Sequence, residues 1–499
     1  MKQLLNKILS PQLFAVCYLP WLAINMTSVV NVMDFTRVVL IAFAVWAVAI
    51  CVKMYFFSDK TAWTHKAMPL LLLFLAACLF SQVVQFAYGG LDVIGKMCYF
   101  SLCILVLYSQ HGSTIEDYKK SFSVVARVLG IVIGIMMAIC DWMFLNLYQG
   151  RITIRTGNEV YLGFAENRLY GIFTSPNVGA TYALILIWCS MLVFMWAKDM
   201  RAKWFWRVLS LVQIGLATMF VSVALSRGAY LSGAVMAGAF LLMKAPLLKD
   251  PFVRLWKKLM PNGINRAATV VLSIVGVAAG ILICVYGIQA VNKLSVKLMA
   301  WNHEQKVESS QVEDTTDKQE IINNAMLGSD GRVEANRQDI DITNKRAIIW
   351  TSHLSLLKGK HLLIGVNRPL AYLEKNPAVV ESLSTEQLFN IKRAGGNMHC
   401  GYLQMLVNGG LLAFIPMMVF LVWCLVLTVR FLIKLFKGKT DLADPHYQMF
   451  SWTMPMVLAI LANNVFETNF VLMGANFFQA FFWFVAGACV LSMREGVKK

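Results

Sequence analysis

The chain has 499 residues, of which 58% are hydrophobic and only 14% are charged. An ordinary soluble domain has roughly a quarter of charged residues, and here the apolar residues come in long runs instead of a 3.6-residue period. The composition therefore excludes a soluble globular protein and indicates an all-α polytopic membrane protein.

The apolar runs are long enough to cross a membrane many times. A spanning helix needs about 20 apolar residues, because each residue rises 1.5 Å and backbone amides cannot stay unpaired in hydrocarbon. This length predicts about 12 spans. In chain order they are Leu13–Val30, Thr36–Phe57, Met68–Tyr88, Leu91–Tyr108, Phe122–Tyr148, Val178–Ala197, Phe205–Leu225, Gly228–Leu248, Ala267–Ala290, Leu403–Ile433, Met449–Phe466 and Phe470–Leu491. The first is longer than a signal-peptide core and no small-residue cleavage pattern follows it, so we expect it to be retained.

The net charge of +18 is distributed unevenly between the predicted turns. If the N-terminus is cytoplasmic, the turns and termini on that side hold 24 of the 45 basic residues, whereas the short turns on the other side hold six. Those six are Arg37, Lys96, Arg151, Arg155, Arg168 and Arg227. Such an asymmetry is typical of the positive-inside rule and predicts that both termini are cytoplasmic. The basic excess is therefore explained by topology, and we expect no nucleic-acid partner.

One long polar stretch, residues 291–401, divides the spans into helices 1 to 9 (residues 1–290) and helices 10 to 12 (residues 402–499). It is nearly neutral, because residues 291–400 hold 14 basic and 13 acidic residues. The charge asymmetry places this stretch outside, as one large extracytoplasmic loop.

The loop is expected to be mainly helical. Asn344 can cap a helix reaching about Lys358, in which one face is shared by Arg346, Trp350, His353 and Leu357. A second helix is predicted from Ser384, which forms a capping-box pattern with Gln387, to about Arg393. Gly365, Pro369 and Pro377 interrupt the region between the two, and Gly395-Gly396 ends the second helix.

Four residues on the expected outer side are candidates for chemistry: Arg168, Arg227, Arg346 and His399. A guanidinium presents a planar fork that matches phosphate oxygens, so arginines that converge on one pocket would bind a diphosphate. Arginines near a membrane surface also reach toward lipid headgroups without any such role. Arg227 interrupts the apolar stretch Ala217–Met243, where a charge is costly unless it serves a pocket or has a partner.

His399 stands directly before a predicted span. An imidazole can accept a proton near neutral pH, so His399 is a candidate general base, although a lone histidine at a helix start is often only structural. His303, His353, His361 and His399 are too scattered for a zinc signature, and we expect no metal site.

These segments follow one another in a recognisable order. They are Arg168 to Asn177, Ser226-Arg227-Gly228, the Arg346-xxx-Trp350 helix with Leu363-Ile-Gly365, and His399-Cys-Gly-Tyr402-Leu-Gln followed by Gly409-Gly410. Together with the layout of spans and loop, they resemble the O-antigen ligase and O-antigen polymerase superfamily of bacterial membrane glycosyltransferases. That family usually has Asn after the loop histidine, whereas this chain has Cys400.

The resemblance implies metal-independent transfer of a glycan from undecaprenyl diphosphate to a hydroxyl of a glycan or glycolipid acceptor. The reaction would occur at the outer face of the bacterial inner membrane without a cofactor. Arg227 and Arg346, with Arg168 as a third candidate, would stabilise the leaving diphosphate, and His399 would deprotonate the acceptor. Ligase and polymerase are not separated by these motifs.

Two other classes of protein stay open. A flippase or transporter of lipid-linked sugars would place ionisable groups within spans, for which Arg127 and Asp141 are the candidates. A receptor or assembly scaffold would not gather the arginines around His399.

Overall fold

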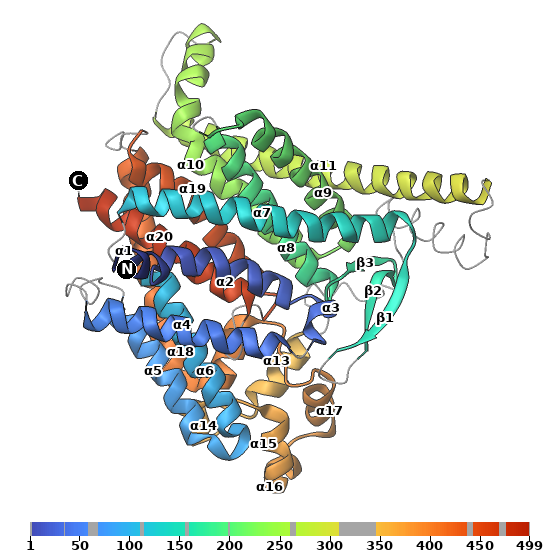
Figure 1. Cartoon of the computed structure of the whole chain (residues 1–499), viewed down its shortest axis with the longest axis vertical. Coiled ribbons are helices and arrows are strands. Elements are labelled where there is room, and N and C mark those ends of the chain that lie inside the picture. Colours follow the sequence, from blue (N-terminus) through green and yellow to red (C-terminus); the bar gives the residue numbers. More distant parts are fainter. Residues whose placement is uncertain are drawn as a thin grey trace.

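The protein folds into a bundle of long helices with three short strands, as the computed structural model in Figure 1 shows. The structure describes residues 2–33, 35–57, 68–109, 114–154, 159–197, 200–259, 266–308, 346–436, 443–468 and 476–498. The first half contains α1 (Lys2–Ile8), α2 (Pro11–Asn25), α3 (Ser28–Asn31), α4 (Phe35–Phe56), α5 (Met68–Val84), α6 (Phe86–Ser109), α7 (Ile115–Leu145), α8 (Pro176–Trp196), α9 (Lys203–Ala224) and α10 (Arg227–Leu259). The second half contains α11 (Arg266–Glu308), α13 (Arg346–Leu354), α14 (Lys360–Ile364), α15 (Pro369–Lys375), α16 (Pro377–Glu381), α17 (Thr385–Arg393), α18 (Gly401–Phe436), α19 (Pro445–Asn463) and α20 (Phe477–Lys498).

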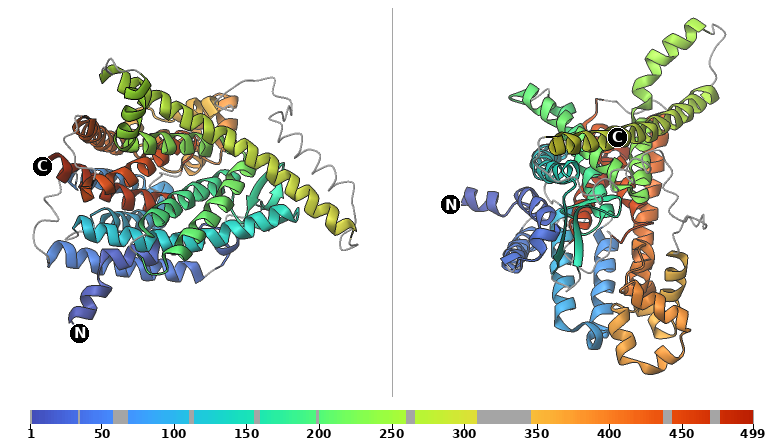
Figure 2. Two further views of the ribbon diagram at one scale, coloured as in Figure 1. Left: turned by 90° about the horizontal axis from the view of Figure 1, so that it is seen from above. Right: turned by 90° about the vertical axis from the view of Figure 1, so that its right-hand side faces the viewer.

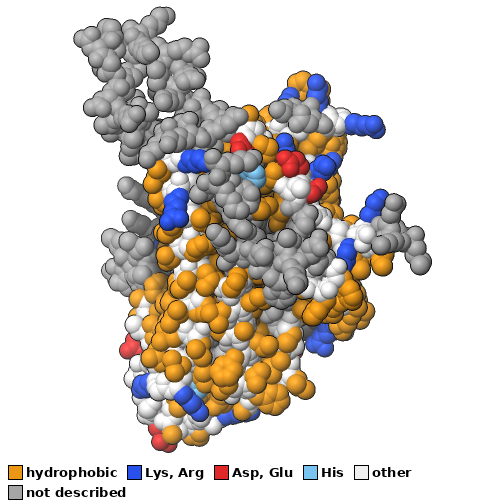
Figure 3. All heavy atoms as spheres, turned by 90° about the vertical axis from the view of Figure 1, so that its left-hand side faces the viewer, with side chains coloured by type: hydrophobic (Ala, Val, Ile, Leu, Met, Phe, Trp, Pro, Cys, Tyr) orange, Lys and Arg blue, Asp and Glu red, His pale blue; other side chains and the backbone are white. Residues whose placement is uncertain are grey.

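The chain is a mainly helical, multi-pass membrane protein. Within the described ranges, six helices are long and apolar enough to cross a bilayer: α4, α6, α7, α8, α9 and α18. Their outward side chains are apolar as well. On α18 the exposed residues Ile415, Val419, Val422 and Val426 repeat at helical spacing, and Figure 3 shows hydrophobic side chains over much of the lower part of one face. Water does not favour so large an apolar surface, and lipid does.

Each of the twelve predicted spans overlaps one of the long helices. Because six helices meet the criteria of length and hydropathy, the number of twelve crossings stays a prediction. The largest difference is at α11, which continues beyond the expected end at Ala290 to Glu308, into the first part of the predicted loop.

α8 lies at the centre of the bundle. Its side chains are apolar on all sides, as expected for a helix with neighbours all round. In its most apolar 18-residue segment 72% of the residues are buried, against 22% in the corresponding segment of α4 at the edge. α8 packs against α7 and α9, α19 lies between α10 and α20, and α18 packs along α5 (Figures 1 and 2). The ends of the chain lie toward one end of the bundle and the strands toward the other. Which end faces the cytoplasm stays a prediction.

The sequence-based prediction contained no strand, and on this point it was incomplete. β1 (Gln149–Thr153), β2 (Glu159–Ala165) and β3 (Arg168–Gly171) form an antiparallel sheet in that order. The segment is rich in Ile, Val, Thr and Tyr, which favour strands, and it was hidden between two stronger apolar runs. The sheet leads directly into α8, whose first turn is capped by Ser175 with Pro176 at the first position.

The end of the predicted loop is helical, as expected. The capping box of Ser384 and Gln387 is present at the start of α17, which ends at Arg393, and Gly395 and Gly396 follow with positive φ. α13 begins at Arg346, and its predicted cap Asn344 lies outside the described residues. The helix ends at Leu354 and not at about Lys358, so Leu357, predicted on its face, lies in the connection before Gly359.

A kink in α18 lets this loop segment approach the bundle closely. Gly410 has φ +63° inside the helix, and Gly365 has φ +78° after α14. A Cβ atom on Gly365 would come within 2.6 Å of the backbone of Asn408 and Gly410, so only glycine permits this contact. The contact fixes the residues after Gly365 against α5 and α18.

Candidate functional site

His399 lies in the short connection between α17 and α18, where neighbouring amide side chains hold the backbone. It adopts a left-handed conformation (φ 50°), which is uncommon for a residue other than glycine. Its backbone N–H donates to Asn397 Oδ1 (2.9 Å), and the preceding N–H of Met398 donates to Gln404 Oε1 (2.7 Å). Such a sparsely populated conformation persists only where the surroundings enforce it, which is frequent at functional sites.

The start of α18 is tied to the end of α19. The N–H of Gly401 donates to the carbonyls of Asn464 (2.7 Å) and Glu467 (3.0 Å). A Cβ atom at position 401 would lie 2.6 Å from Asn464 Oδ1, so the glycine two residues after His399 is required for this close approach. His399 is thereby placed beside the Asn463–Glu467 turn.

The face of α13 that carries Arg346, Trp350 and His353 points toward the segment of His399. Trp350 Nε1 donates to the carbonyl of Met398 (2.8 Å), next to His399. Arg346 and His353, each one turn from Trp350 on the same face, are both close enough to act electrostatically on His399. The face that these residues share is therefore the one that meets the histidine.

Arg346 spans the gap from α13 to the end of α19. Its Nη1 donates to the carbonyl of Phe466, its guanidinium lies 5.9 Å from the centre of the Phe466 ring, and its Nη2 lies 3.5 Å from Glu467 Oε1. The Arg346 and Glu467 side chains are 17% and 13% exposed, so water screens their attraction only partly.

Glu467 also connects Arg346 to Arg168. The amide Nδ2 of Asn177 donates to Glu467 Oε1 (2.7 Å), and Arg168 Nη2 donates to Asn177 Oδ1 (3.0 Å). Arg168 Nε in turn donates to the carbonyl of Ala224 at the end of α9 (3.0 Å). One continuous network, here called the Arg–Glu network, thus consists of Arg168, Asn177, Glu467 and Arg346.

Arg227 is the first residue of α10, and its side chain is exposed. No ion pair or hydrogen bond of its side chain joins it to the other described residues. Gly228 lies beside the Arg–Glu network, because a Cβ atom there would be 3.6 Å from Phe466 Cβ. The backbone at the start of α10 is therefore near Phe466, and the exposed side chain of Arg227 extends from the adjoining residue.

The site holds His399 in its neutral form at neutral pH. Burial lowers the pKa of His399 below its usual value, and the positive charge of Arg346 and the interaction with His353 lower it further. Burial raises the pKa of Glu467, whereas Arg346 and the bond from Asn177 act in the opposite direction. A neutral imidazole is the form that can accept a proton.

Cys400, which stands where the resembled family has Asn, is buried and takes no part in a disulfide. Burial raises the pKa of its thiol, although backbone donors from Leu403 and Tyr402 and the charge of Arg346 partly oppose this. A thiol with a raised pKa is a poor nucleophile, so His399 remains the candidate for proton transfer.

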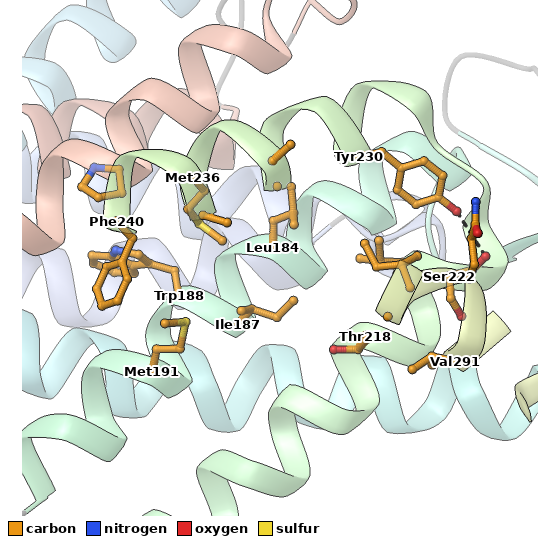
Figure 4. Close-up of a pocket in the computed structure, with 18 of the residues that line it drawn as sticks. Leu184, Ile187, Trp188, Met191, Thr218, Ser222, Tyr230, Met236, Phe240 and Val291 are labelled. Carbon is orange, nitrogen blue, oxygen red and sulfur yellow. Dashed lines mark hydrogen bonds between the residues drawn. The ribbon is translucent and has the colours of Figure 1, made fainter. Parts of the chain in front are cut away.

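An apolar cavity of about 940 Å³ opens among α8, α9, α10, α11 and α19 (Figure 4). One end is formed by Phe240, Trp188 and Met191. At the other end, Ser222 accepts hydrogen bonds at its carbonyl from Tyr230 Oη (3.3 Å) and Asn292 Nδ2 (2.7 Å). This polar end is near the Arg–Glu network, because Tyr230 of its lining interacts electrostatically with Arg168.

The structure brings three of the four predicted residues, Arg168, Arg346 and His399, into one region. Arg168 and Arg346 share the network through Glu467, Arg227 begins the adjoining helix, and His399 experiences the charge of Arg346. The sequence analysis missed Glu467. Its only local signal is the polar run Asn463-Asn464-Val465-Phe466-Glu467 between two apolar helices.

No model of a known protein family matches this sequence, and no curated protein matches it significantly. Across the described ranges, His, Cys, Asp and Glu side chains form no group of three that could hold a metal ion.

Proposed function

We propose that the protein transfers a glycan from undecaprenyl diphosphate to an acceptor hydroxyl, as an O-antigen ligase or surface-polysaccharide polymerase does. The single observation that carries the proposal is the position of the Arg–Glu network. It lies between a neutral histidine and the polar end of an apolar cavity. A lipid diphosphate has one apolar tail and one strongly anionic group, and this arrangement offers a place for each.

The leaving group determines what the arginines do. When the glycosidic C1–O bond to the phosphate breaks, its electron pair stays on the diphosphate, which gains negative charge. Arg227 and Arg346 would stabilise that charge through bidentate, charge-assisted hydrogen bonds, and Arg168 would add to the positive potential. Since Glu467 carries one negative charge against the two arginines of the network, the network keeps a net positive charge.

The base supplies the other half of the reaction. His399 would take the proton of the acceptor hydroxyl as its oxygen bonds to C1 of the donor sugar, and it would later release that proton to water. No covalent enzyme intermediate and no metal are needed in this sequence of steps.

The apolar cavity suits the polyprenyl tail. On α10 its lining residues Tyr230, Gly233, Ala237 and Phe240 follow one face over about 15 Å, given a rise of 1.5 Å per residue. An apolar groove of this kind gains free energy from the tail by burying it, and the polar end leaves the diphosphate at the network.

This function goes together with the number of spans and the sidedness that the sequence predicts. We propose twelve spans in a bacterial inner membrane, cytoplasmic termini, and residues 291–401 as the extracytoplasmic loop between residues 1–290 and 402–499. The donor, the acceptor and the membrane lipids are then the partners.

A second candidate is a flippase or transporter of lipid-linked sugars, and two charged residues inside helices favour it. Asp141 of α7 is 3% exposed, and neither of its carboxylate oxygens has a hydrogen-bond partner among the described residues. Lys244 of α10 donates to Ser451 Oγ (3.0 Å). Arg127, the other residue proposed from the sequence, instead donates to the carbonyl of Ser123 (3.0 Å).

Purified protein in detergent separates the two candidates. With a synthetic polyprenyl-diphosphate oligosaccharide, a mixture of glycan acceptors and EDTA, we expect a transferase to form a lengthened or conjugated glycan. A transporter forms no product there, because detergent provides no second compartment. Absence of product, together with movement of the lipid-linked sugar across proteoliposomes, would replace the transferase proposal with the transporter.

A further inference from the structure

A second pocket lies beside the segment that carries His399, because Asn397 and Gln404 are among its lining residues. Its volume is about 490 Å³, within the range of small-ligand sites. It is formed by α15, the glycines after α17, the first turns of α18, and Thr468 after Glu467. Most of its lining residues are polar, in contrast to the cavity among α8 to α11.

The polar groups of this pocket are mainly amides. Asn367, Gln404 and Asn408 are each at most 6% exposed and line it together with Asn397. An amide both donates and accepts hydrogen bonds, as a sugar hydroxyl does. Arg368 is already paired with Asp92 (3.3 Å), and Glu374 adds one negative charge, so nothing in the lining selects a strongly anionic ligand.

Asn367 has an unmet hydrogen-bonding group. Its backbone N–H donates to Gln85 Oε1 (2.7 Å) and its Nδ2 donates to Gln82 Oε1. Its Oδ1 is buried and has no partner in the described parts of the chain.

The pocket shares its wall with the candidate base. Asn397 accepts from the backbone of His399 and Gln404 accepts from the backbone of Met398, so the two amides that hold the histidine also line the pocket. Thr468 follows the glutamate that pairs with Arg346. A ligand in this pocket would therefore lie next to the segment that carries His399.

We infer that this amide pocket binds the acceptor as a neutral, hydroxyl-rich pyranose residue, with the attacking hydroxyl directed to His399. The inference rests on the proposed transferase function. It assigns the two halves of the reaction to two sites: the donor lipid to the cavity among α8 to α11, and the acceptor sugar to the pocket at α15 and α18.

A bulky side chain can fill the pocket without touching the Arg–Glu network or His399. Ala371 of α15 is half-buried and lines the pocket, so Ala371→Trp should block it. Ala378→Trp is the matched control, because Ala378 is exposed on α16 and does not line the pocket. Two readouts are needed: transfer kinetics with each substrate varied, and saturation-transfer NMR of the purified protein with maltopentaose and chitotetraose.

For Ala371→Trp we expect the KM for the acceptor to rise at least about tenfold, a loss of about 1.4 kcal/mol of binding. The KM for the donor should stay unchanged, and Ala378→Trp should behave like the wild type. An unchanged acceptor KM in Ala371→Trp overturns the pocket assignment while leaving the transferase function standing. A raised donor KM overturns it too, since the pocket would then hold the donor glycan.

The NMR experiment separates the failure of the pocket from the failure of the function. If the wild type transfers nothing but binds an oligosaccharide, and Ala371→Trp abolishes that binding, the sugar pocket stands and the transferase proposal falls. If the wild type gives no saturation transfer with either oligosaccharide and Ala371→Trp leaves the kinetics intact, the pocket is no sugar site.

Discussion

Arg346 and Glu467 face each other across the start of α13 and the end of α19, with 3.5 Å between Nη2 and Oε1. The pair joins the loop helix to the membrane bundle beside His399. Because the same carboxylate accepts a hydrogen bond from Asn177, which holds Arg168, it orients two of the three arginines. Glu467 is thus a positioning residue in the account proposed here.

Replacing that carboxylate should reduce turnover. Glu467→Gln keeps the shape and a polar contact with Asn177 but loses the ion pair with Arg346, so we expect kcat to fall about tenfold, equivalent to one charge-assisted hydrogen bond. The donor KM should not rise, because one negative charge near the diphosphate is removed. Glu166→Gln, on the exposed hairpin, is the control and should be silent. Full activity of Glu467→Gln would show that the network is not needed.

Arg227 is expected to contact the diphosphate directly. Arg227→Lys keeps the positive charge but loses the bidentate fork, so we predict a loss of transfer of about 10- to 1000-fold at normal protein levels. Arg151→Lys serves as control, since Arg151 pairs with Glu159 on the exposed sheet (3.7 Å) and lies 5.1 Å from the centre of the Tyr161 ring. The measurement is the rate of glycan transfer in membranes with matched expression of the variants. A wild-type rate in Arg227→Lys would show that Arg227 only contacts lipid headgroups.

The pH dependence follows from the environment of His399. Burial, then the charge of Arg346 and the interaction with His353, lower its pKa, so the neutral base is present at neutral pH and is lost as the pH falls through that lowered value. Arg346→Gln removes that charge, so the pKa should rise and the acid limb of kcat/KM should move to higher pH. Arg393→Gln, on exposed α17, should leave the limb in place. An equal loss of activity at every pH would assign Arg346 a role independent of His399.

The topology can be tested by labelling cysteines in intact spheroplasts. Ser382→Cys, exposed after α16, should react with a membrane-impermeant thiol reagent, whereas Lys203→Cys, exposed at the start of α9, should react only after permeabilisation. Both are made in a chain whose exposed Cys17 and Cys98 are replaced by Ser. The reverse labelling pattern would place His399 and the loop in the cytoplasm and contradict the proposed site.

Local signals in the sequence predicted local structure well. The capping box of Ser384 and Gln387 and the shared face of Arg346, Trp350 and His353 depend on neighbours within one or two turns, and both are present. Glu467 could not be assigned in the same way, because its partners Arg346 and Asn177 lie far away in the sequence and meet it only through packing. The sheet of β1 to β3 was missed because strong apolar runs on either side dominated the interpretation. The continuation of α11 to Glu308 was missed because polarity marks the end of a span and not the end of a helix.

The central claim is that His399 takes a proton from the acceptor, and its most direct test is the rate of glycan transfer by purified His399→Ala. With a polyprenyl-diphosphate oligosaccharide, an acceptor and EDTA, we predict transfer about 100- to 10,000-fold slower than in the wild type, with nearly unchanged donor binding. His446→Ala, at the start of α19, should transfer normally. A His399→Ala protein that folds, binds donor and transfers at the wild-type rate would contradict the account.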